Sequence, residues 1–367
     1  MHVERVAEAD KPALRDLLLL ADEQWDMVER YLGRGELYAR SHDGAVRAEL
    51  LLTDEGAGVA EIQNLAVDPA WQHRGLGARL VAYALRRCTG RFGRLRVRTG
   101  DSPLTVPFYT RVGFVEVGRI PDYFCQHYDH PIYEAGQRLR DAVVLEQPVP
   151  EGHAPTRWFT SDLHLGDRAI ARWRGFGDDQ QAHDDLILGR LEACLQARDE
   201  LWILGDVCRP RVEDVVRLRA ALPCAQVHVI VGNHDSRSKF ATAGCYGTVD
   251  YYAHVGKHKR DGYRFVLSHY PMLDWDRAYH GAFMLHGHIH SLPADQESRP
   301  GQDVVPPDRS HGGMGLAGYN QQMRDAACRR YDVGVDANGY APVSAEQIIA
   351  FLGDDASWSA AHGLPVD

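Results

Sequence analysis

Short apolar runs in the second half of the chain repeatedly end in polar residues that can bind metal ions. Five runs rich in β-branched or aromatic residues predict strands at residues 158–160, 201–204, 227–231, 265–267 and 282–285. The clusters that follow these strands are Asp162-Leu-His164, Gly205-Asp206, Gly232-Asn233-His234-Asp235, Ser268-His269 and His286-Gly-His288-Ile-His290. Because the strands of an open α/β sheet end along one crevice, the five clusters predict a single site.

The side chains in these clusters are ones that divalent cations prefer. Within Asp162–His164 and His288–His290, the strand period of two predicts that both side chains point the same way. Asp, Asn and His without a thiolate suit ions such as Mn, Fe, Zn or Co. A lone His beside a strand is more often a hydrogen-bonded core or surface residue, but five clusters in order favour a metal site.

In this order the clusters resemble the signature of the calcineurin-like metallophosphoesterase superfamily, which reads DxH, GD, GNHD, an isolated His and GHxH. The resemblance covers about residues 155–350 and implies an α/β sandwich that hydrolyses phosphoesters with two divalent metal ions. One ion would be bound by Asp162, His164, Asp206 and His290, and the second by Asp206, Asn233, His269 and His288, with Asp206 bridging.

The resemblance also implies a role for the residues between the ligands. His234, held by Asp235, would stabilise charge on the phosphoryl group or protonate the departing oxygen. Alternatively, Asp235 caps the next helix. The superfamily often continues GD into GDxxDR, but the second acid is missing here, and Arg209 is either a phosphate contact or a plain surface arginine.

The length of the chain predicts two domains, because 367 residues exceed one ordinary core. The sequence LEQPVPEGHAPT at 145–156 contains three prolines and little apolar periodicity, which predicts a semi-rigid linker. We therefore expect domains at 1–145 and 157–355, joined by a linker at 146–156.

Residues 61–88 predict a strand, a glycine-rich turn and an amphipathic helix. The buried face of this helix would be formed by Leu80, Val81, Ala84 and Leu85. Glycines at 75 and 77 would let backbone amides approach a ligand closely at the positive end of the helix, an arrangement that suits a pyrophosphate.

Together with the segment FYTRVGF at 108–114, the turn Gln72-His-Arg-Gly75-Leu-Gly77 resembles the Q/RxxGxG/A signature of the GNAT superfamily of N-acetyltransferases. The resemblance covers about residues 1–145 and implies a mixed sheet with flanking helices, acetyl-CoA as cofactor and an amine acceptor. It places cofactor-binding groups at Leu65, Ala66, Val67, Gln72, His73, Arg74, Gly75, Leu76, Gly77 and Ala78.

Two further residues carry the predicted acetyl transfer. By the resemblance, Tyr109 would protonate the leaving CoA thiolate, although a packed aromatic is the alternative. Glu61 is the candidate base acting through water, or else a solvated strand terminus. The aromatic segment 123–140 either shapes the acceptor pocket or packs as the last strand.

Net charge and cysteine content narrow the possible binding partners and the cellular compartment. A formal net charge of −10 does not favour a protein that grips nucleic acid. The arginines between 86 and 98 are better interpreted as a solvated face than as a basic patch. Seven scattered cysteines without CxxC spacing predict a reducing cytoplasm. We expect no signal peptide, and no apolar stretch approaches the roughly 20 residues that span a bilayer.

We therefore interpret the chain as a cytoplasmic α/β enzyme that joins an acetyltransferase to a phosphoesterase acting on a small phosphate mono- or diester. Alternatives are a first domain that only binds or senses acetyl-CoA, or a phosphoesterase that processes RNA or nucleotides. The sequence does not define an oligomeric state. The long segment 291–330 is either a lid over the phosphoester or a surface insertion.

Overall fold

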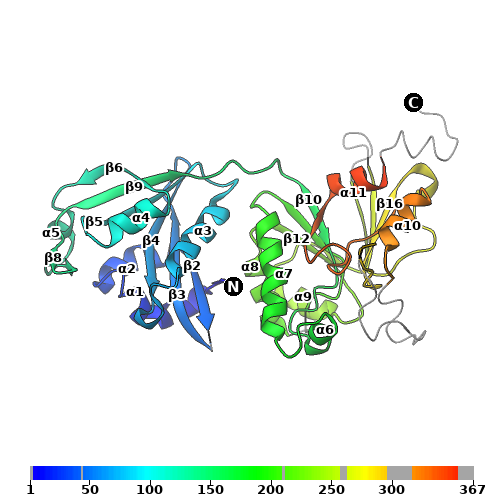
Figure 1. The fold of residues 1–367 in the computed structure, drawn as a ribbon, viewed down its shortest axis with the longest axis horizontal. Helices are drawn as coiled ribbons and strands as arrows, with labels where there is room; N and C mark the ends of the chain where they lie inside the picture. Colours follow the sequence, from blue (N-terminus) through cyan, green and yellow to red (C-terminus); the bar gives the residue numbers. More distant parts are fainter. Residues whose placement is uncertain (1–2, 43, 209–210, 257–262, 296–315, 354–367) are drawn as a thin grey trace. The chain divides into compact units, whose positions relative to one another are not determined.

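The chain forms two compact units, one ending at His153 and the other beginning at Ala154. The computed structural model describes residues 3–42, 44–208, 211–256, 263–295 and 316–353 (Figure 1). Both units combine sheets with helices, so the predicted α/β class is confirmed. No helix in the described ranges is long and apolar enough to cross a membrane.

The first unit is built on one seven-stranded sheet in the order β1-β2-β3-β4-β5-β9-β6. Its strands are β1 (Glu4–Arg5), β2 (Glu36–His42), β3 (Ala45–Asp54), β4 (Val59–Val67), β5 (Arg94–Gly100), β6 (Val115–Ile120) and β9 (Ala142–Pro148), with a separate pair β7 (Tyr133–Glu134) and β8 (Gln137–Arg138). Its helices are η1 (Glu8–Leu14), α1 (Arg15–Leu18), α2 (Trp25–Leu32), η2 (Pro69–Trp71), α3 (Leu76–Cys88), α4 (Thr105–Arg111) and α5 (Tyr123–His127). Neighbouring strands are antiparallel except β4 and β5.

The parallel strands β4 and β5 are paired only over their first halves. Their register ends at Ile62 opposite Val97, after which β4 continues to Val67 and β5 to Gly100. On the other side of β4, Leu51 faces Asn64 and Leu52 faces Ile62, which leaves Gln63 as an extra residue. Such a β-bulge bends its strand. The ends of β4 and β5 therefore separate, and a cavity opens between them.

Helices cover both faces of this sheet. Alternate residues of β3 point to opposite sides and pack against different helices. Leu50 and Leu52 pack in the cluster that includes α3, whose predicted apolar face is buried. Leu51 packs instead with α1 and α2, through Leu18 and Val28. The sheet is thus fixed between two helical layers, which holds the separated strand ends in place.

The predicted linker begins too early. Strand β9 continues to Pro148 and pairs with β5, with Arg94 opposite Pro148 and Leu95 opposite Gln147. Leu145 and Gln147 are buried, so burial of alternate residues outweighs the breaking effect of the nearby prolines. The segment between the last strand of the first unit and the first strand of the second unit is therefore 149–156.

The second unit contains a five-stranded and a four-stranded sheet, in the orders β13-β12-β11-β10-β18 and β14-β15-β16-β17. The strands are β10 (Arg157–Thr160), β11 (Glu200–Ile203), β12 (Gln226–Ile230), β13 (Val249–Asp250), β14 (Tyr252–Val255), β15 (Phe265–Ser268), β16 (Phe283–His286), β17 (Arg330–Asp332) and β18 (Val343–Ser344). The helices are α6 (Arg168–Trp173), α7 (Gln180–Cys194), α8 (Val212–Ala221), α9 (Arg237–Ala243), η3 (Ala278–His280), α10 (Tyr319–Asp325) and α11 (Ala345–Leu352).

The two sheets pack face to face, since Phe159 and Trp202 of the first share a buried cluster with Phe265 and Phe283 of the second. Helices α7 and α8 lie over the outer face of the five-stranded sheet (Figure 1), with their apolar side chains in one cluster with β11 and β12. All five predicted strands are present, but they belong to two sheets rather than to one.

Candidate functional sites

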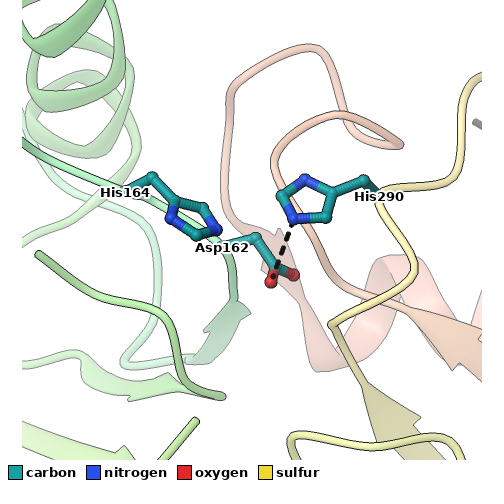
Figure 2. A group of neighbouring side chains, drawn as sticks. All are labelled: Asp162, His164 and His290. Carbon is teal, nitrogen blue, oxygen red and sulfur yellow. Dashed lines mark ion pairs between the residues drawn. The ribbon is translucent and has the colours of Figure 1, made fainter. Parts of the chain in front are cut away.

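Two groups of acidic and histidine side chains follow strand ends in the second unit. Asp162, His164 and His290 form one group (Figure 2), and Asp206, His269 and His288 form the other, with ligand atoms in each group within 4.8 Å of one another. In the first group, Nε2 of His290 lies 3.8 Å from Oδ1 of Asp162. The residues that could hold metal ions therefore converge from distant parts of the chain.

Asp206 lies between the two groups. Its Oδ2 atom is 3.6 Å from Nε2 of His164 and 3.4 Å from Nε2 of His269. Burial raises the pKa of Asp206, but hydrogen bonding to His269 and the charges of nearby imidazoles outweigh it and hold that pKa below its ordinary value. One ionised carboxylate oxygen thus faces both histidines, which is the position that a bridging ligand requires.

The remaining predicted ligand, Asn233, joins the second group through His269. Its Oδ1 atom is 2.9 Å from Nε2 of His269. On the other side of the same ring, Nδ1 lies 2.8 Å from the carbonyl oxygen of Leu204. The ring is therefore oriented by the backbone after β11 and directs Nε2 toward Asn233 and Asp206.

The nitrogen chemistry of the first group fits a cation. Nε2 of His164 is buried and has no hydrogen-bond partner among the residues that the structure describes. Burial, together with the nearby His290 and Arg174, holds the pKa of His164 well below its ordinary value. A neutral imidazole with an unused lone pair is the form that binds a metal.

The backbone at this site is strained, and the predicted strand period is wrong there. Strands β10 and β16 end at Thr160 and His286, so the DxH and HxH segments lie beyond them. Five residues have left-handed φ angles: Asp162 (59°), His164 (49°), Asp206 (52°), His288 (72°) and His290 (46°). This conformation costs about 1–2 kcal/mol for each non-glycine residue. The side chains converge because of tight turns, not because of strand alternation.

The predicted contact between Asp235 and His234 is also absent from the described residues. The Asp235 carboxylate accepts hydrogen bonds from the backbone amides of Asp206, Val207 and Gly232. It does not cap a helix either, because α9 begins after Ser236. Asp235 instead ties the turn after β11 to the turn after β12, which positions Asp206.

His234 lies at the exposed edge of the site. Its ring is 5.2 Å from the ring of His164, measured between centroids, in an edge-to-face arrangement. An exposed imidazole beside a buried ligand group is available to a substrate rather than enclosed in the metal-binding groups.

A buried ion pair behind the site was not predicted from the sequence. Nδ1 of His290 lies 2.8 Å from the Asp336 carboxylate, which is paired in turn with Arg174 at 2.6 Å. Arg174 also donates to the backbone carbonyls of Asp162 and Leu163. Asp336 follows β17 as the predicted ligands follow their strands, so the sequence could have suggested Asp336 as a site residue. No sequence signal indicates Arg174.

The first unit contains a cavity of about 540 Å³ between the separated ends of β4 and β5. Of the residues predicted to bind the cofactor, Leu65, Ala66, Val67 and Gln72 line it, whereas residues 73–78 do not. The predicted catalytic residues Glu61 and Tyr109 line it as well. A volume of this size is typical of a small-molecule or cofactor site.

The glycine-rich turn forms the beginning of α3. Gly75 has a left-handed φ of 76° and precedes the helix, where a glycine costs least. At Gly77 a Cβ would lie 3.1 Å from Cζ of Phe108, so packing also requires a glycine there, and the predicted approach of a ligand stays a prediction. Gly77 allows α3 to approach Phe108, while the guanidinium of Arg74 stacks over Trp71 at 4.7 Å.

Tyr109 and Glu61 are both buried. Burial raises the pKa of Tyr109, so its phenol remains protonated. Burial also raises the pKa of Glu61 even though Arg98 opposes the shift. The alternative of a solvated terminus for Glu61 is wrong, since its side chain is 2% exposed and pairs with Nε of Arg98 at 2.5 Å.

Two further sequence hypotheses concern the aromatic segment 123–140 and the arginines between 86 and 98. Tyr123, Tyr128, Tyr133 and Glu134 line the cavity, so the aromatic segment 123–140 forms part of its wall, and its role in an acceptor pocket stays a prediction. The arginines between 86 and 98 do not form a free basic patch. Arg91, Arg94, Arg96 and Arg98 are paired with Glu36, Glu146, Glu146 and Glu61 respectively, and Arg87 donates to Tyr38.

Two predictions concern residues outside the described ranges. Arg209, the candidate phosphate contact, is one of them. The lid hypothesis rests on Arg299, Arg309 and His311, which also lie outside these ranges.

Comparison with known proteins agrees with the division into two units. The family "Acetyltransferase (GNAT) domain" matches residues 32–116, and the family "Calcineurin-like phosphoesterase" matches residues 156–302. The fold and sites thus define a two-part α/β enzyme. The chain belongs to the GNAT N-acetyltransferases through its first unit, and its second unit contains a calcineurin-like phosphoesterase domain by its match to that family.

Individual relatives are similar over part of the chain. The uncharacterized N-acetyltransferase YvbK of Bacillus subtilis (strain 168) is 34% identical over 143 residues, which covers 38% of this chain and 92% of YvbK. The Gene 66 protein of Mycobacterium phage L5 is 27% identical over 161 residues, covering 36% of this chain and 77% of that protein. Among solved structures, the IAA acetyltransferase from Bacillus cereus ATCC 14579 is 31% identical, with a TM-score of 0.38, covering 40% of this chain and 97% of that one.

The ion pair behind the site gives a stability prediction. We expect Arg174→Met to lower the free energy of unfolding of the second unit by about 3–5 kcal/mol, because it leaves Asp336 buried without its counter-charge. Denaturant unfolding followed by tryptophan fluorescence measures the change. Arg172→Met is the matched control, since its partner Asp178 is solvent-exposed and the pair contributes little. Equal effects of the two substitutions would contradict the structural role of Arg174.

Proposed function

We propose that the chain is a bifunctional enzyme, an acetyl-CoA-dependent N-acetyltransferase joined to a dimetal phosphoesterase that hydrolyses a phosphate mono- or diester. The phosphoesterase domain would begin at about residue 157, and the acetyltransferase domain would end with β9 at Pro148. The observation that carries the proposal is the position of Asp206, whose single oxygen Oδ2 faces a histidine of each ligand group.

In the second unit, Asp162, His164, Asp206 and His290 would bind one divalent ion, and Asp206, Asn233, His269 and His288 would bind the other. The ions, of the Mn, Fe, Zn or Co class, would supply Lewis acidity and an activated water. The exposed His234 would donate a proton to the departing oxygen of the ester. Asp235 would act at a distance by holding the backbone of Asp206 in place.

In the first unit, β4 is paired with β3 at Leu65, Ala66 and Val67 but no longer with β5. The edge of β4 that faces β5 would hold the pantetheine arm of acetyl-CoA. The amides from Gln72 to Ala78 at the beginning of α3 would face its pyrophosphate, with the charge of Arg74 nearby. Tyr109 would give its proton to the CoA sulfur as the carbon–sulfur bond breaks. Glu61 lines the same cavity and is a candidate for the base.

Two alternatives are less well supported. A domain that only senses acetyl-CoA has no need for a protonated tyrosine at the cavity wall, where Tyr109 lies. A protein that grips nucleic acid needs free cations, whereas most arginines between 86 and 98 are paired with acids. Metal analysis of the purified protein, combined with a screen of phosphate monoesters, diesters and acetyl acceptors, tests the proposal directly.

For the metal site, we expect Asp206→Asn to abolish phosphoester hydrolysis and to reduce the bound metal, because both ions lose a shared negative ligand. Elemental analysis and hydrolysis of an activated aryl phosphate measure the two effects. Asp178→Asn, which removes an exposed carboxylate from the same unit, should change neither. A fully metallated Asp206→Asn protein with normal turnover would show that the bridging assignment is wrong.

His234→Ala should retain the metals but lower turnover about 100-fold or more, because His234 would act on the ester rather than on the ions. The same metal analysis and rate assay separate these effects. His280→Ala removes another exposed histidine of this unit and serves as the control. If His234→Ala protein lost its metals, His234 would be a ligand.

Tyr109→Phe should slow acetyl transfer about 100-fold while leaving the affinity for acetyl-CoA unchanged, since the phenol would act only when the thiolate departs. Calorimetric titration gives the affinity, and release of free CoA thiol gives the rate. An equal loss of affinity and rate would assign Tyr109 a structural role in the apolar cluster that includes Phe114.

A further inference from the structure

One carboxylate on the wall of the cavity in the first unit is held without a cation. Asp22 lies between α1 and α2 and lines the cavity. Its Oδ2 accepts a hydrogen bond from the Tyr31 hydroxyl at 3.0 Å, and its Oδ1 accepts one from the Tyr128 hydroxyl at 3.1 Å. Both donors are neutral, because burial raises the pKa of each tyrosine.

The charge of Asp22 is therefore not neutralised within the unit. Among the described residues, no Lys, Arg or His nitrogen lies within 4.0 Å of its carboxylate. Burial raises the pKa of Asp22, while the two tyrosines and the Gln24 amide oppose the shift. A carboxylate can accept about four hydrogen bonds. The free lone pairs of Asp22 are thus available to a donor in the cavity.

A short chain of hydrogen bonds connects Asp22 to the strand proposed to hold the cofactor. Nδ2 of Asn64 donates to the Tyr31 hydroxyl at 2.9 Å, and Tyr31 donates to Asp22. Asn64 directly precedes Leu65 on β4 and also donates to the carbonyl of Leu18 at 3.0 Å. Asp22 and the cofactor strand are thus held in one frame and border one cavity.

The other acids near the cavity are less suited to receive a cation. One oxygen of Glu61 is taken by the Arg98 guanidinium. Glu49 is buried and does not line the cavity, and burial raises its pKa to about 8, so it is neutral at pH 7. Glu23 is half exposed at 52% and lies near His130. Glu134 also lines the cavity, but the described donor to its carboxylate is the Thr105 hydroxyl at 3.4 Å. Among these five acids, Asp22 combines a place in the cavity and partial burial with two hydroxyl donors at 3.0 and 3.1 Å.

We infer that Asp22 binds the ammonium group of a primary amine acceptor and takes its first proton, so that the acceptor is a small cationic amine with an apolar portion. This inference rests on the proposed acetyl transfer and names its substrate class. Met27, Tyr123 and Phe124 line the same cavity and supply apolar and aromatic surface for the rest of the acceptor.

The reaction balances with the residues present. The ammonium ion gives one proton to Asp22 and becomes a neutral amine. Its nitrogen attacks the acetyl carbon, a carbon–nitrogen bond forms, and the carbon–sulfur bond breaks with its electron pair on sulfur. The nitrogen loses its second proton to solvent, the sulfur gains a proton from Tyr109, and Tyr109 regains a proton from solvent. The products are the N-acetyl amide and CoA thiol, and Asp22 releases its proton to solvent.

Calorimetric titration of the full-length protein, saturated with a non-hydrolysable acetyl-CoA analogue, tests the binding site. The probes are phenethylamine, tryptamine and spermidine, with 2-phenylethanol and 3-phenylpropionate as neutral and anionic counterparts of the first. The wild-type protein should bind at least one amine, and neither counterpart should bind as tightly. If no amine binds, or if 3-phenylpropionate binds more tightly than the amines, the inference is overturned.

Asp22→Asn should weaken binding of that amine at least tenfold and lower kcat/KM for its acetylation about 100-fold, with the affinity for acetyl-CoA unchanged. The unchanged affinity shows that the variant is folded. Asp22→Glu restores the charge and should recover part of the binding. Asp16→Asn, an exposed aspartate on α1, is the matched control and should behave as the wild type.

The two proposals fail in different ways. If the wild-type protein releases CoA with an amine and Asp22→Asn is equally active, the assignment of Asp22 is wrong and acetyl transfer stands. If amines bind in an Asp22-dependent manner without any release of CoA, the amine site stands and acetyl transfer is wrong.

Discussion

The phosphoesterase unit depends on the burial of several acidic and histidine side chains close together around Asp206. Burial, helped by the nearby carboxylates of Asp206 and Asp332, raises the pKa of Asp162 to about 6. Burial together with His269 lowers the pKa of His288 to about 4. Such a group of desolvated acids and imidazoles opposes folding, because burial conflicts with the charge of each ionised member. Divalent cations resolve the conflict, since they favour ionised carboxylates and neutral imidazoles at once. The charge pattern therefore fits two ions better than it fits a purely structural cluster.

The rest of the unit is arranged to tolerate this site. Five ligand residues have left-handed backbone, which together costs several kcal/mol at about 1–2 kcal/mol each. The strands before them are almost fully buried, with aromatic side chains of both sheets interlocked between the layers. Asp235 fixes one turn to another through three backbone amides, and Arg174 fixes two carbonyls beside Asp162. The rigidity of the sandwich is thus what holds the strained turns, and the turns are what bring the ligands together.

The sequence predicted features that depend on local pattern and failed where distant contacts decide. Five strands followed by ligand clusters were visible because period and residue type are local. The tight turns at the DxH and HxH segments could not be predicted, because a left-handed backbone at Asp or His does not change the hydrophobic pattern. The end of β9 was misplaced because its pairing with β5 overrides the nearby prolines. Asp22 went unnoticed since its partner Tyr128 is 106 residues away, and Arg174 since Asp336 is 162 residues away.

Carboxylates in the two units fall into classes by the nature of their partners. Glu61 and Asp336 each have an internal arginine, so their charge is neutralised before any ligand arrives. Asp235 has no cationic partner among the described residues, but its carboxylate accepts hydrogen bonds from three backbone amides and needs no further partner. Asp22 also has only neutral donors, the Tyr31 and Tyr128 hydroxyls and the Gln24 amide, but unlike Asp235 it borders the cavity of the first unit. Even a partly buried charge without a counter-ion is destabilising unless a cation binds to it. The same reasoning that assigns divalent ions to Asp162 and Asp206 predicts that the substrate supplies the cation that pairs with the Asp22 carboxylate.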